Sequence, residues 1–251
     1  MACQSDEFIM KIVFAKQEFL VGRMQKVVAF LLGQLQAKKA TRVVLPCSLH
    51  DLAVIDRGQK QASFYQNVDY FVNDSMWLTF WFRLQSKSKL DRLYGPDLMK
   101  AVLQDSSDKK HYFLAADSLT RSRLKKYLKQ NHPHLDGEFA FLPKNISITT
   151  EQKFLQKALL SQASIIWLGI GSPKQVQLAE FIKQNSQGKL VFCVGAAFEF
   201  LTGQKKQAPR WMQNSGLEWL FRLLSEPKRL WQRYLIEVPR WVFSSLKEKL
   251  K

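Results

Sequence analysis

The stretch SIIWLGIGSPKQVQLAEFIKQ, residues 164–184, decides the fold class. It opens with a continuous apolar run, turns at Gly169 and Gly171, and continues with apolar residues at helical spacing. This order predicts a fully buried strand, a turn and a helix. Units of this kind build parallel sheets that helices cover on both faces.

The same alternation recurs along the chain. Further apolar runs, most of them followed by a polar turn and a helix-like pattern, stand at residues 42–45, 69–72, 111–114, 138–142 and 189–194. Residues 17–38 have apolar positions at helical spacing and predict a surface-packed helix. We therefore expect a doubly wound α/β fold with a mostly parallel sheet.

Composition divides the chain into two parts. A chain of 251 residues, 46% of them hydrophobic, can bury one substantial core. Residues 204–251 differ, because they hold eleven Lys or Arg against four Glu, a net charge of +7, and four of the seven Trp. We expect an α/β core over residues 1–203 and a basic, Trp- and Arg-rich helical appendage over residues 204–251. Its cations and indoles suit a membrane interface, or else the Trp are core anchors and the Lys a solvated face.

Several classes of protein are disfavoured. Three cysteines without metal-ligand spacing indicate neither a disulfide framework nor a zinc site, which suits a reducing cytoplasm. No apolar stretch is long enough to span a membrane, and no export signal is recognisable. The net charge of +17 indicates an anionic partner. Because no nucleic-acid-binding motif is found, we expect no nucleic acid, although a basic nucleic-acid-binding module remains the first alternative.

The strand ends are where ligands are expected, because such sheets bind them beyond the carboxyl ends of their strands. Asp74 follows the run at 69–72, and Glu199 follows the run at 189–194. These carboxylates are the best placed to face a common crevice. No Asp-x-Asp pair ends a strand, so we expect no divalent metal and no cofactor.

The turn at residues 169–175 predicts an anion site. Ser172 and Gln175 have the spacing of a capping box at the start of a helix, which presents free N–H groups and a positive dipole end. Gly169 and Gly171 would let a ligand approach the backbone, and Lys174 adds a charge. Alternatively, Gln175 merely caps the helix and Lys174 is solvated.

The C-terminal third carries a resemblance. Residues 194–235, VGAAFEFLTGQKKQAPRWMQNSGLEWLFRLLSEPKRLWQRYL, closely resemble the signature of the WecG/TagA/CpsF family of bacterial glycosyltransferases. The shared blocks are a glycine turn at Gly195, Ala-Phe-Glu-Phe, Ala-Pro-x-Trp, Gly-Leu-Glu-Trp and Glu-Pro-x-Arg-Leu-x-x-Arg-Tyr. The turn at residues 169–175 is also similar to the family's, and a weaker likeness extends back to about residue 40.

The resemblance implies a Rossmann-like core and an inverting transfer of an N-acetylmannosamine-type sugar, or its uronic acid, from a UDP donor. The implied acceptor is a sugar on polyprenyl diphosphate, and the product feeds surface polysaccharides such as teichoic acid linkage units, capsule or exopolysaccharide. It also implies a cytoplasmic protein, peripheral at the inner face of the cell membrane. The donated sugar stays open, as does the choice between a monomer and a homo-oligomer.

The resemblance also implies residue roles. Asp74 stands where the family has its proposed general base, although Asn73 and Ser75 replace its usual Pro and Gly neighbours; alternatively, Asp74 caps the following helix. Gln175 matches a donor-pocket Gln, and Glu199 an acidic residue that contacts the nucleotide-sugar; their alternatives are a helix cap and a surface carboxylate.

Two departures near the first strand end bear on the donor. Ser48 falls near a family Asn, and Pro46 near a Thr that contacts the sugar in relatives. With the altered neighbours of Asp74, these changes raise a second alternative, a divergent homologue that has lost activity.

Three arginines in the appendage suit a diphosphate. Ser215 and Glu218 have capping-box spacing, and Arg222, Arg229 and Arg233 follow at intervals of seven and four residues. They share one face if the helix continues past Pro227. Pro227 alternatively begins a second helix, which moves the latter two away, or all three are solvated.

The last residues, from Pro239 on, predict a short amphipathic helix. It would form either a membrane-contacting foot or a helix packed on the core. The residues of the foot are Arg240, Trp241, Phe243, Leu246, Lys247 and Lys249.

Overall fold

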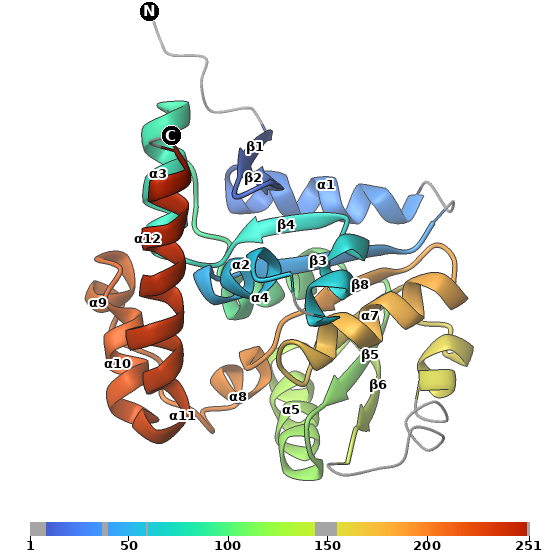
Figure 1. Ribbon diagram of the computed structural model, residues 1–251. Helices are drawn as coiled ribbons and strands as arrows, with labels where there is room; N and C mark the ends of the chain where they lie inside the picture. Colours follow the sequence, from blue (N-terminus) through green and yellow to red (C-terminus); the bar gives the residue numbers. More distant parts are fainter. Residues whose placement is uncertain (1–8, 37–39, 59, 144–154, 250–251) are drawn as a thin grey trace, which may run out of the picture.

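The computed structural model describes residues 9–36, 40–58, 60–143 and 155–249 (Figure 1). The strands are β1 Met10–Phe14, β2 Gln17–Val21, β3 Arg42–Cys47, β4 Tyr70–Asn73, β5 Lys110–Ala115, β6 Asp136–Phe141, β7 Ile165–Gly169 and β8 Leu190–Cys193. Helices up to residue 203 are α1 Met24–Gln36, α2 Leu49–Asp56, the 3-10 helix η1 Lys60–Asn67, α3 Met76–Ser86, α4 Gly95–Asp105, α5 Ser118–Asn131, a helix at 155–160, α7 Lys174–Asn185 and α8 Ala197–Leu201.

These strands form one sheet in the order β1-β2-β4-β3-β8-β7-β5-β6. Strands β2 to β8 run parallel, and only β1 is antiparallel, at one edge. All six strands expected from the apolar runs are present, shifted by two residues or fewer at either end. The predicted α/β fold with a mostly parallel sheet is therefore confirmed.

The helix predicted over residues 17–38 is wrong in its first part. Residues 17–21 form β2, and α1 begins only at Met24. Ala15 and Lys16 have positive φ angles of 49° and 62° and close a tight turn, so β1 and β2 form a hairpin. The consecutive residues 19–21 are all buried, which fits a strand covered on both faces and not a surface helix.

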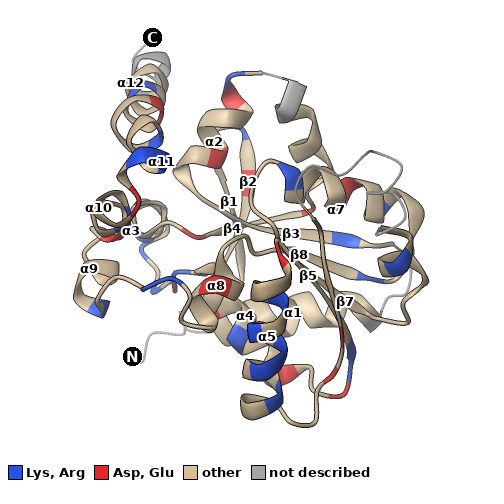
Figure 2. Ribbon diagram, turned by 90° about the horizontal axis from the view of Figure 1, so that it is seen from below, with Lys and Arg blue, Asp and Glu red and all other residues tan. Residues whose placement is uncertain are grey.

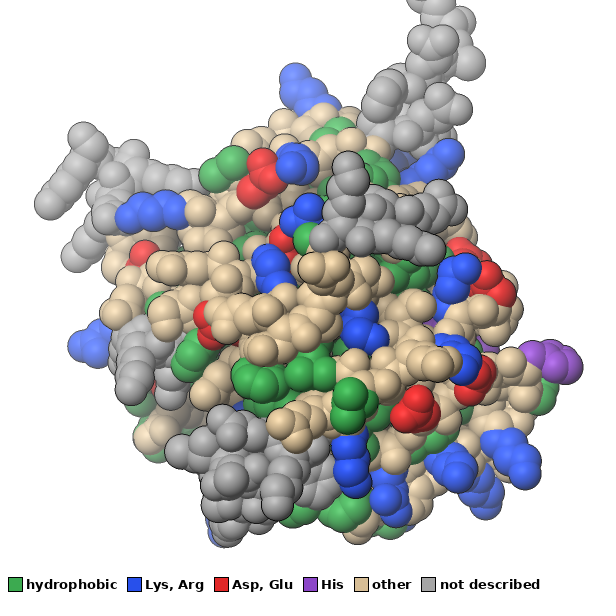
Figure 3. Space-filling model, turned by 90° about the vertical axis from the view of Figure 1, so that its right-hand side faces the viewer, with side chains coloured by type: hydrophobic (Ala, Val, Ile, Leu, Met, Phe, Trp, Pro, Cys, Tyr) green, Lys and Arg blue, Asp and Glu red, His purple; other side chains and the backbone are tan. Residues whose placement is uncertain are grey.

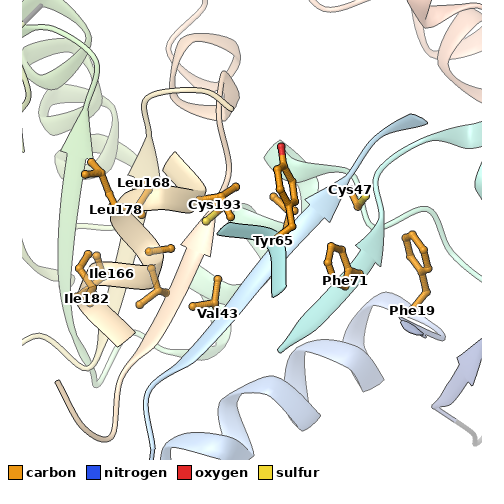
Figure 4. Close-up of a cluster of buried hydrophobic side chains, with 14 of the residues drawn as sticks. Phe19, Val43, Cys47, Tyr65, Phe71, Ile166, Leu168, Leu178, Ile182 and Cys193 are labelled. Atoms are coloured by element: carbon orange, nitrogen blue, oxygen red, sulfur yellow. The ribbon is translucent and has the colours of Figure 1, made fainter. Parts of the chain in front are cut away.

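Two apolar layers hold the sheet. Helices α1, α4, α5 and α8 pack on one face, and α2, η1, α3, α7 and α12 pack on the other. Figure 4 shows part of the second layer, in which the Tyr65 side chain lies between Cys193 on one side and Cys47 and Phe71 on the other. Because both faces are covered, the strands can be apolar throughout.

The C-terminal helices gather at one end of the sheet (Figure 1). They are α9 Arg210–Asn214, α10 Glu218–Ser225, α11 Pro227–Trp231, the π-helix η2 Gln232–Glu237 and α12 Val238–Lys249. The chain breaks between α10 and α11 because Pro227 starts a new helix, as the second interpretation of the sequence expected.

The predicted membrane foot is wrong for Trp241. This side chain is only 4% exposed and belongs to the second apolar layer, 6.4 Å from the Phe14 ring. Arg240 and Phe243, in contrast, are exposed. The side chains of Leu246, Lys247 and Lys249 lie outside the described residues. The last helix thus packs on the core through one face and presents another to solvent.

Candidate active site

The carboxyl end of β4 places Asp74 at the start of another helix. The Asp74 N–H donates to the Cys47 carbonyl at the end of β3 (3.3 Å), and Asp74 Oδ1 accepts from the N–H of Gly95, the first residue of α4 (2.9 Å). A carboxylate suits this position, since a helix N-terminus is partly positive. Asp74 does not cap α3, whose N-cap residue is Ser75 and makes no side-chain cap bond.

Asn73, which departs from the family pattern, is part of the fold. Its side chain is fully buried and donates to Thr79 Oγ1 (2.8 Å) and to the Asp91 carbonyl (2.9 Å). These bonds tie the end of β4 to α3 and to the segment before α4. The change at residue 73 therefore supports the turn that holds Asp74.

Three charged side chains surround Asp74. Arg92 donates from Nε to the Asp74 carbonyl and forms a 2.6 Å ion pair with Glu218 of α10. Arg222 lies 4.0 Å from the other oxygen of Glu218. Sequence reasoning missed Arg92 and assigned Glu218 to a capping box. That box is wrong, because α10 begins at Glu218 without a side-chain cap and its carboxylate is used by the arginines.

The environment raises the pKa of Asp74 to about 6. Burial is the largest cause, because it disfavours the charged carboxylate, and the nearby Glu218 charge acts in the same direction. Arg92, the Gly95 N–H and Arg222 oppose them. Asp74 is therefore a stronger base than an exposed carboxylate and is still mostly ionised at pH 7.

Both arginines near Asp74 lie against aromatic rings. The Arg92 guanidinium is 4.2 Å from the Tyr94 ring centre, and that of Arg222 is 5.3 Å from the Phe200 ring centre. Stacking of this kind holds a planar guanidinium in place while its N–H groups stay available at the edge. Residues of α10, of the end of α8 and of the segment just before α4 thus form one wall beside Asp74.

Hydrogen bonds hold the Gln175 side chain between the carboxyl ends of β7 and β8. Its Oε1 accepts from the Gly195 N–H (2.9 Å), and its Nε2 donates to the Cys193 carbonyl (3.3 Å) and to Ser172 Oγ (3.1 Å). The predicted Ser172–Gln175 capping box is wrong, because α7 begins at Lys174 with no side-chain cap bond. Gln175 instead ties the turn after β7 to the turn after β8.

Gly95 connects these turns with Asp74. A methyl group on Gly95 would lie 3.5 Å from the Val194 carbonyl oxygen and 3.8 Å from Asp74 Oδ1. Val194 immediately precedes Gly195, which bonds to Gln175. Together with the charge interaction between Asp74 and Arg222, this chain of contacts places Asp74, Gln175 and Arg222 around the same strand ends.

The two glycines of the turn after β7 differ in role. A Cβ at Gly169 would lie 2.3 Å from the Phe198 ring, so this glycine is needed for helix packing and not for ligand approach. Gly171 has a φ of +84° and open space beside it, so it keeps the turn left-handed. Lys174 is half-buried beside Gln175 as the first residue of α7.

Ser48 caps α2 at the end of β3. Its Oγ accepts from the Asp51 N–H (3.3 Å) and donates to Asp51 Oδ2 (2.6 Å), while the Ser48 N–H also bonds to that carboxylate (3.0 Å). This reciprocal capping box was not expected from the sequence. The Ser48 side chain is therefore engaged within the fold, at the strand end next to Asp74.

Two of the remaining predicted residues, Glu199 of α8 and Arg229 of α11, belong to one chain of ion pairs. Glu199 pairs with Lys205 (2.9 Å), which also reaches Glu226 (3.7 Å), and Glu226 pairs with Arg229 (2.5 Å). Glu199 is thus an ion-paired carboxylate, and its partner is Lys205.

Arg233 lies near His50 of α2, where burial and then the Arg233 charge lower the pKa of His50. Burial is the larger cause, and His50 also bonds to Glu237 (3.0 Å). The helix does not continue past Pro227, so the three arginines do not share one helix face, as the alternative with a second helix expected. The charges of Arg222 and Arg229 still both act on Glu226, between the two helices. Only Arg222 lies beside Asp74.

The cavity described next lies away from these strand ends. A cavity of about 500 Å³ lies at the opposite edge of the sheet, where β6 and the helix at 155–160 line it. Among the described residues, no group of three His, Cys, Asp or Glu gathers as a metal site would need.

Nearly the whole chain matches a known family. The model of the glycosyl transferase WecG/TagA/CpsF family covers residues 13–251. The chain belongs to this family. The match extends beyond the C-terminal blocks and takes in β2, Asp74, Gln175 and the C-terminal helices. The protein is therefore a glycosyl transferase, and the strand ends around Asp74 are its candidate active site.

Proposed function

We propose that this glycosyl transferase moves an N-acetylmannosamine-type sugar, or a related hexose or uronic acid, from a UDP donor to a polyprenyl-diphosphate-linked sugar in bacterial surface polysaccharide synthesis. The observation that carries the proposal is the Asp74 carboxylate, with a pKa raised to about 6, beside Arg92 and Arg222. A base and a diphosphate-binding cation are the two groups that this transfer needs.

In the proposed reaction, Asp74 takes the proton of the acceptor hydroxyl as its oxygen attacks C1 of the donated sugar. The new C1–O bond forms on the face opposite UDP, and the bond from C1 to the UDP oxygen breaks with its electron pair. The configuration at C1 is inverted. Arg222 and Arg92 stabilise the charge on the departing diphosphate.

We also propose that the donor lies across the turns after β7 and β8. Gly171, Lys174, Gln175 and Gly195 belong to these turns, and the start of α7 is the positive end of its helix dipole. The N–H groups of Gln175, Val176 and Gln177 are bonded to carbonyls of the turn itself, so the dipole and the Lys174 charge are what would attract an anion. Ser48, Gly169, Glu199, Arg229 and Arg233 stay proposed substrate-binding residues, and each of them also has contacts within the protein.

We propose a peripheral position at the cytoplasmic face of the cell membrane. None of the helices in the described part of the chain is both long and apolar enough to cross a bilayer. The outer side of the C-terminal helices mixes exposed apolar and basic side chains, which suits an anionic lipid surface. They are Leu224, Lys228, Arg229, Trp231, Leu235, Ile236, Arg240 and Phe243.

The nucleic-acid alternative is not favoured by the charge distribution. Figure 2 shows basic positions on α5 and α7 as well as on α11, and Figure 3 shows Lys and Arg scattered among acidic and apolar side chains on the face away from the C-terminal helices. A nucleic-acid-binding domain would gather them in one stripe or patch.

The proposal is tested by transfer of radiolabelled sugar from a panel of UDP-sugars to a polyprenyl-diphosphate-linked sugar. We expect one donor to be used and Asp74→Asn to lower the rate by about 10²- to 10⁴-fold. Equal rates in both proteins would show that Asp74 is not the base. Binding of UDP-sugar without any transfer by the wild type would instead favour the inactive-homologue alternative.

A further inference from the structure

Helix α3 is apolar on two opposite sides. Leu78 and Phe82 are buried against the sheet, as expected for a covering helix. The outer side carries a second apolar row at spacing i, i+3, i+4, i+7, which we call the α3 stripe. It consists of Trp77 (54% exposed), Phe80 (38%), Trp81 (41%) and Leu84 (76%). Surface helices normally present polar residues on this side, so contiguous exposed apolar residues indicate a binding surface.

The aromatic rings of the stripe are held in place. The Trp77 indole N–H donates to the Gly216 carbonyl (3.1 Å), and its ring meets the Phe80 ring edge-on at 6.4 Å. The Trp81 ring lies 5.9 Å from that of Phe14. The stripe is therefore a preformed surface that costs little ordering on binding.

The charge beside the stripe is positive. From Ser75 to Leu90 the chain has no Asp or Glu, and Lys87 and Lys89 are exposed just beyond Leu84. A second copy of this chain, with its own net charge of +17, would be repelled there. An anionic lipid surface matches both features, because indole rings settle among headgroups and lysines meet phosphates.

The stripe lies close to the candidate active site and to the last helix. α3 starts two residues after Asp74. The Phe14 ring contacts Trp81 and also Trp241 of α12 (6.4 Å), and Figure 1 shows α3 and α12 at the same end of the sheet. Contact through α3 would thus bring the Asp74 turn near the bilayer.

We propose that the α3 stripe, with Lys87 and Lys89, docks the protein on an anionic phospholipid bilayer. The surface belongs to the α/β core and borders the C-terminal helices, and its role rests on the proposed function, since a lipid-linked acceptor would be reached from the membrane.

Vesicle flotation tests this proposal. We compare the wild type, the double variant Trp81→Gln/Leu84→Gln, and a control, Leu119→Gln/Leu160→Gln, whose side chains are exposed on other helices (54% and 84%). We expect binding to vesicles of phosphatidylcholine with phosphatidylglycerol, little binding to phosphatidylcholine alone, and an about tenfold or greater loss only in the α3 variant. Circular dichroism and the Tm confirm that each variant is folded.

Three results would overturn the proposal: no binding by the wild type, equal binding of the α3 variant and the wild type, or self-association of the wild type without lipid that the α3 variant loses. A failure of the docking proposal can be distinguished from a failure of the proposed reaction by using two acceptors. Transfer to a short-chain, water-soluble acceptor is expected to be unchanged in the α3 variant, whereas transfer to an acceptor embedded in vesicles falls. If neither acceptor is used while flotation succeeds, the proposed reaction fails and the docking surface stands.

Discussion

Charged side chains from distant parts of the sequence shift the pKa of Asp74 in opposite directions. Glu218 raises its pKa, and Arg92 and Arg222 lower it. Glu218 and Arg222 come from α10, whereas Arg92 precedes α4, so the acidity of Asp74 depends on how the C-terminal helices meet the core. The raised pKa of about 6 follows mainly from burial at that junction.

Opposite pKa shifts are expected from two substitutions. Glu218→Gln removes a negative charge near Asp74 and should lower its pKa, whereas Arg92→Met removes a positive charge and should raise it. The carbon-13 shifts of the aspartate side-chain carboxyls report this pKa directly, and Asp74→Asn assigns the signal.

A matched control for this measurement is Glu199→Gln, because Glu199 pairs with Lys205 instead. Shifts in the same direction for Glu218→Gln and Arg92→Met would contradict the assigned charge contacts. If Asp74 is the base, activity should rise with pH through its pKa, and the rise should move with the measured value.

The strands β5, β7 and β8 carry a row of aromatic rings on one face. His111 stacks near Trp167 (6.3 Å), which stacks on Phe192 at 4.5 Å. His111 Nδ1 accepts the Trp167 indole N–H (3.0 Å), and Nε2 lies 3.0 Å from the Ser106 carbonyl, so the bonded tautomer is neutral with its proton on Nε2. Adjacent strands are thus joined by side chains as well as by backbone.

Acid should weaken this part of the sheet through His111. Burial lowers its pKa to about 4, and an exposed histidine titrates near 6.5. Between these values the unfolded chain binds a proton that the folded chain does not, so stability falls as the pH falls. We expect the free energy of unfolding, measured with urea, to fall between pH 7 and pH 5 by about 2 kcal/mol more in the wild type than in His111→Gln.

The raised pKa of Asp74 has the opposite effect on stability, because the folded chain then binds this proton more tightly than the unfolded chain as the pH falls. The effect is the same in the wild type and in His111→Gln, so the difference between these two proteins comes from His111. His134→Gln, at an exposed loop position, should behave as the wild type. An unchanged pH dependence in His111→Gln would show that His111 is not held neutral.

At the scale of the whole molecule, the C-terminal helices are attached to the core by a few long-range contacts. Trp241 is buried in the layer that also covers the sheet, and Glu237 reaches His50 (3.0 Å) and Arg57 (3.8 Å) of the α2 region. Because Glu218 and Arg222 belong to the same group of helices, this attachment also positions the charges around Asp74.

Trp241→Ala should loosen that attachment. Loss of a buried Trp costs about 3–5 kcal/mol, whereas Phe243→Ala on the same helix removes a side chain that is 67% exposed and should stay within about 0.5 kcal/mol of the wild type. Urea unfolding gives both values, and limited proteolysis should cut Trp241→Ala first within the C-terminal helices. Equal stabilities of the two variants would exclude Trp241 as the anchor.

Local pattern was enough for much of the fold and for the place of Asp74. Apolar runs of strand length predicted β3 to β8, because burial on both faces leaves a continuous signal in the chain. The family resemblance, carried by residues 194–235, was confirmed by the match over residues 13–251. The β1–β2 hairpin was missed, because the apolar residues of β2 and α1 merge into one helical spacing.

Side-chain partners were decided by the tertiary structure. Ser172 and Gln175, and likewise Ser215 and Glu218, have the spacing of capping boxes, yet Gln175 bonds across to Gly195 and Glu218 pairs with Arg92. A local spacing says which groups can meet within one helix. The spacing cannot show whether a partner distant in sequence binds the same group more strongly. A buried carboxylate or amide loses its hydrogen bonds to water, and it therefore pairs with the group that best replaces them. The sequence by itself therefore determined the sheet and the position of Asp74 at a strand end, whereas only the folded chain decided which charges surround it.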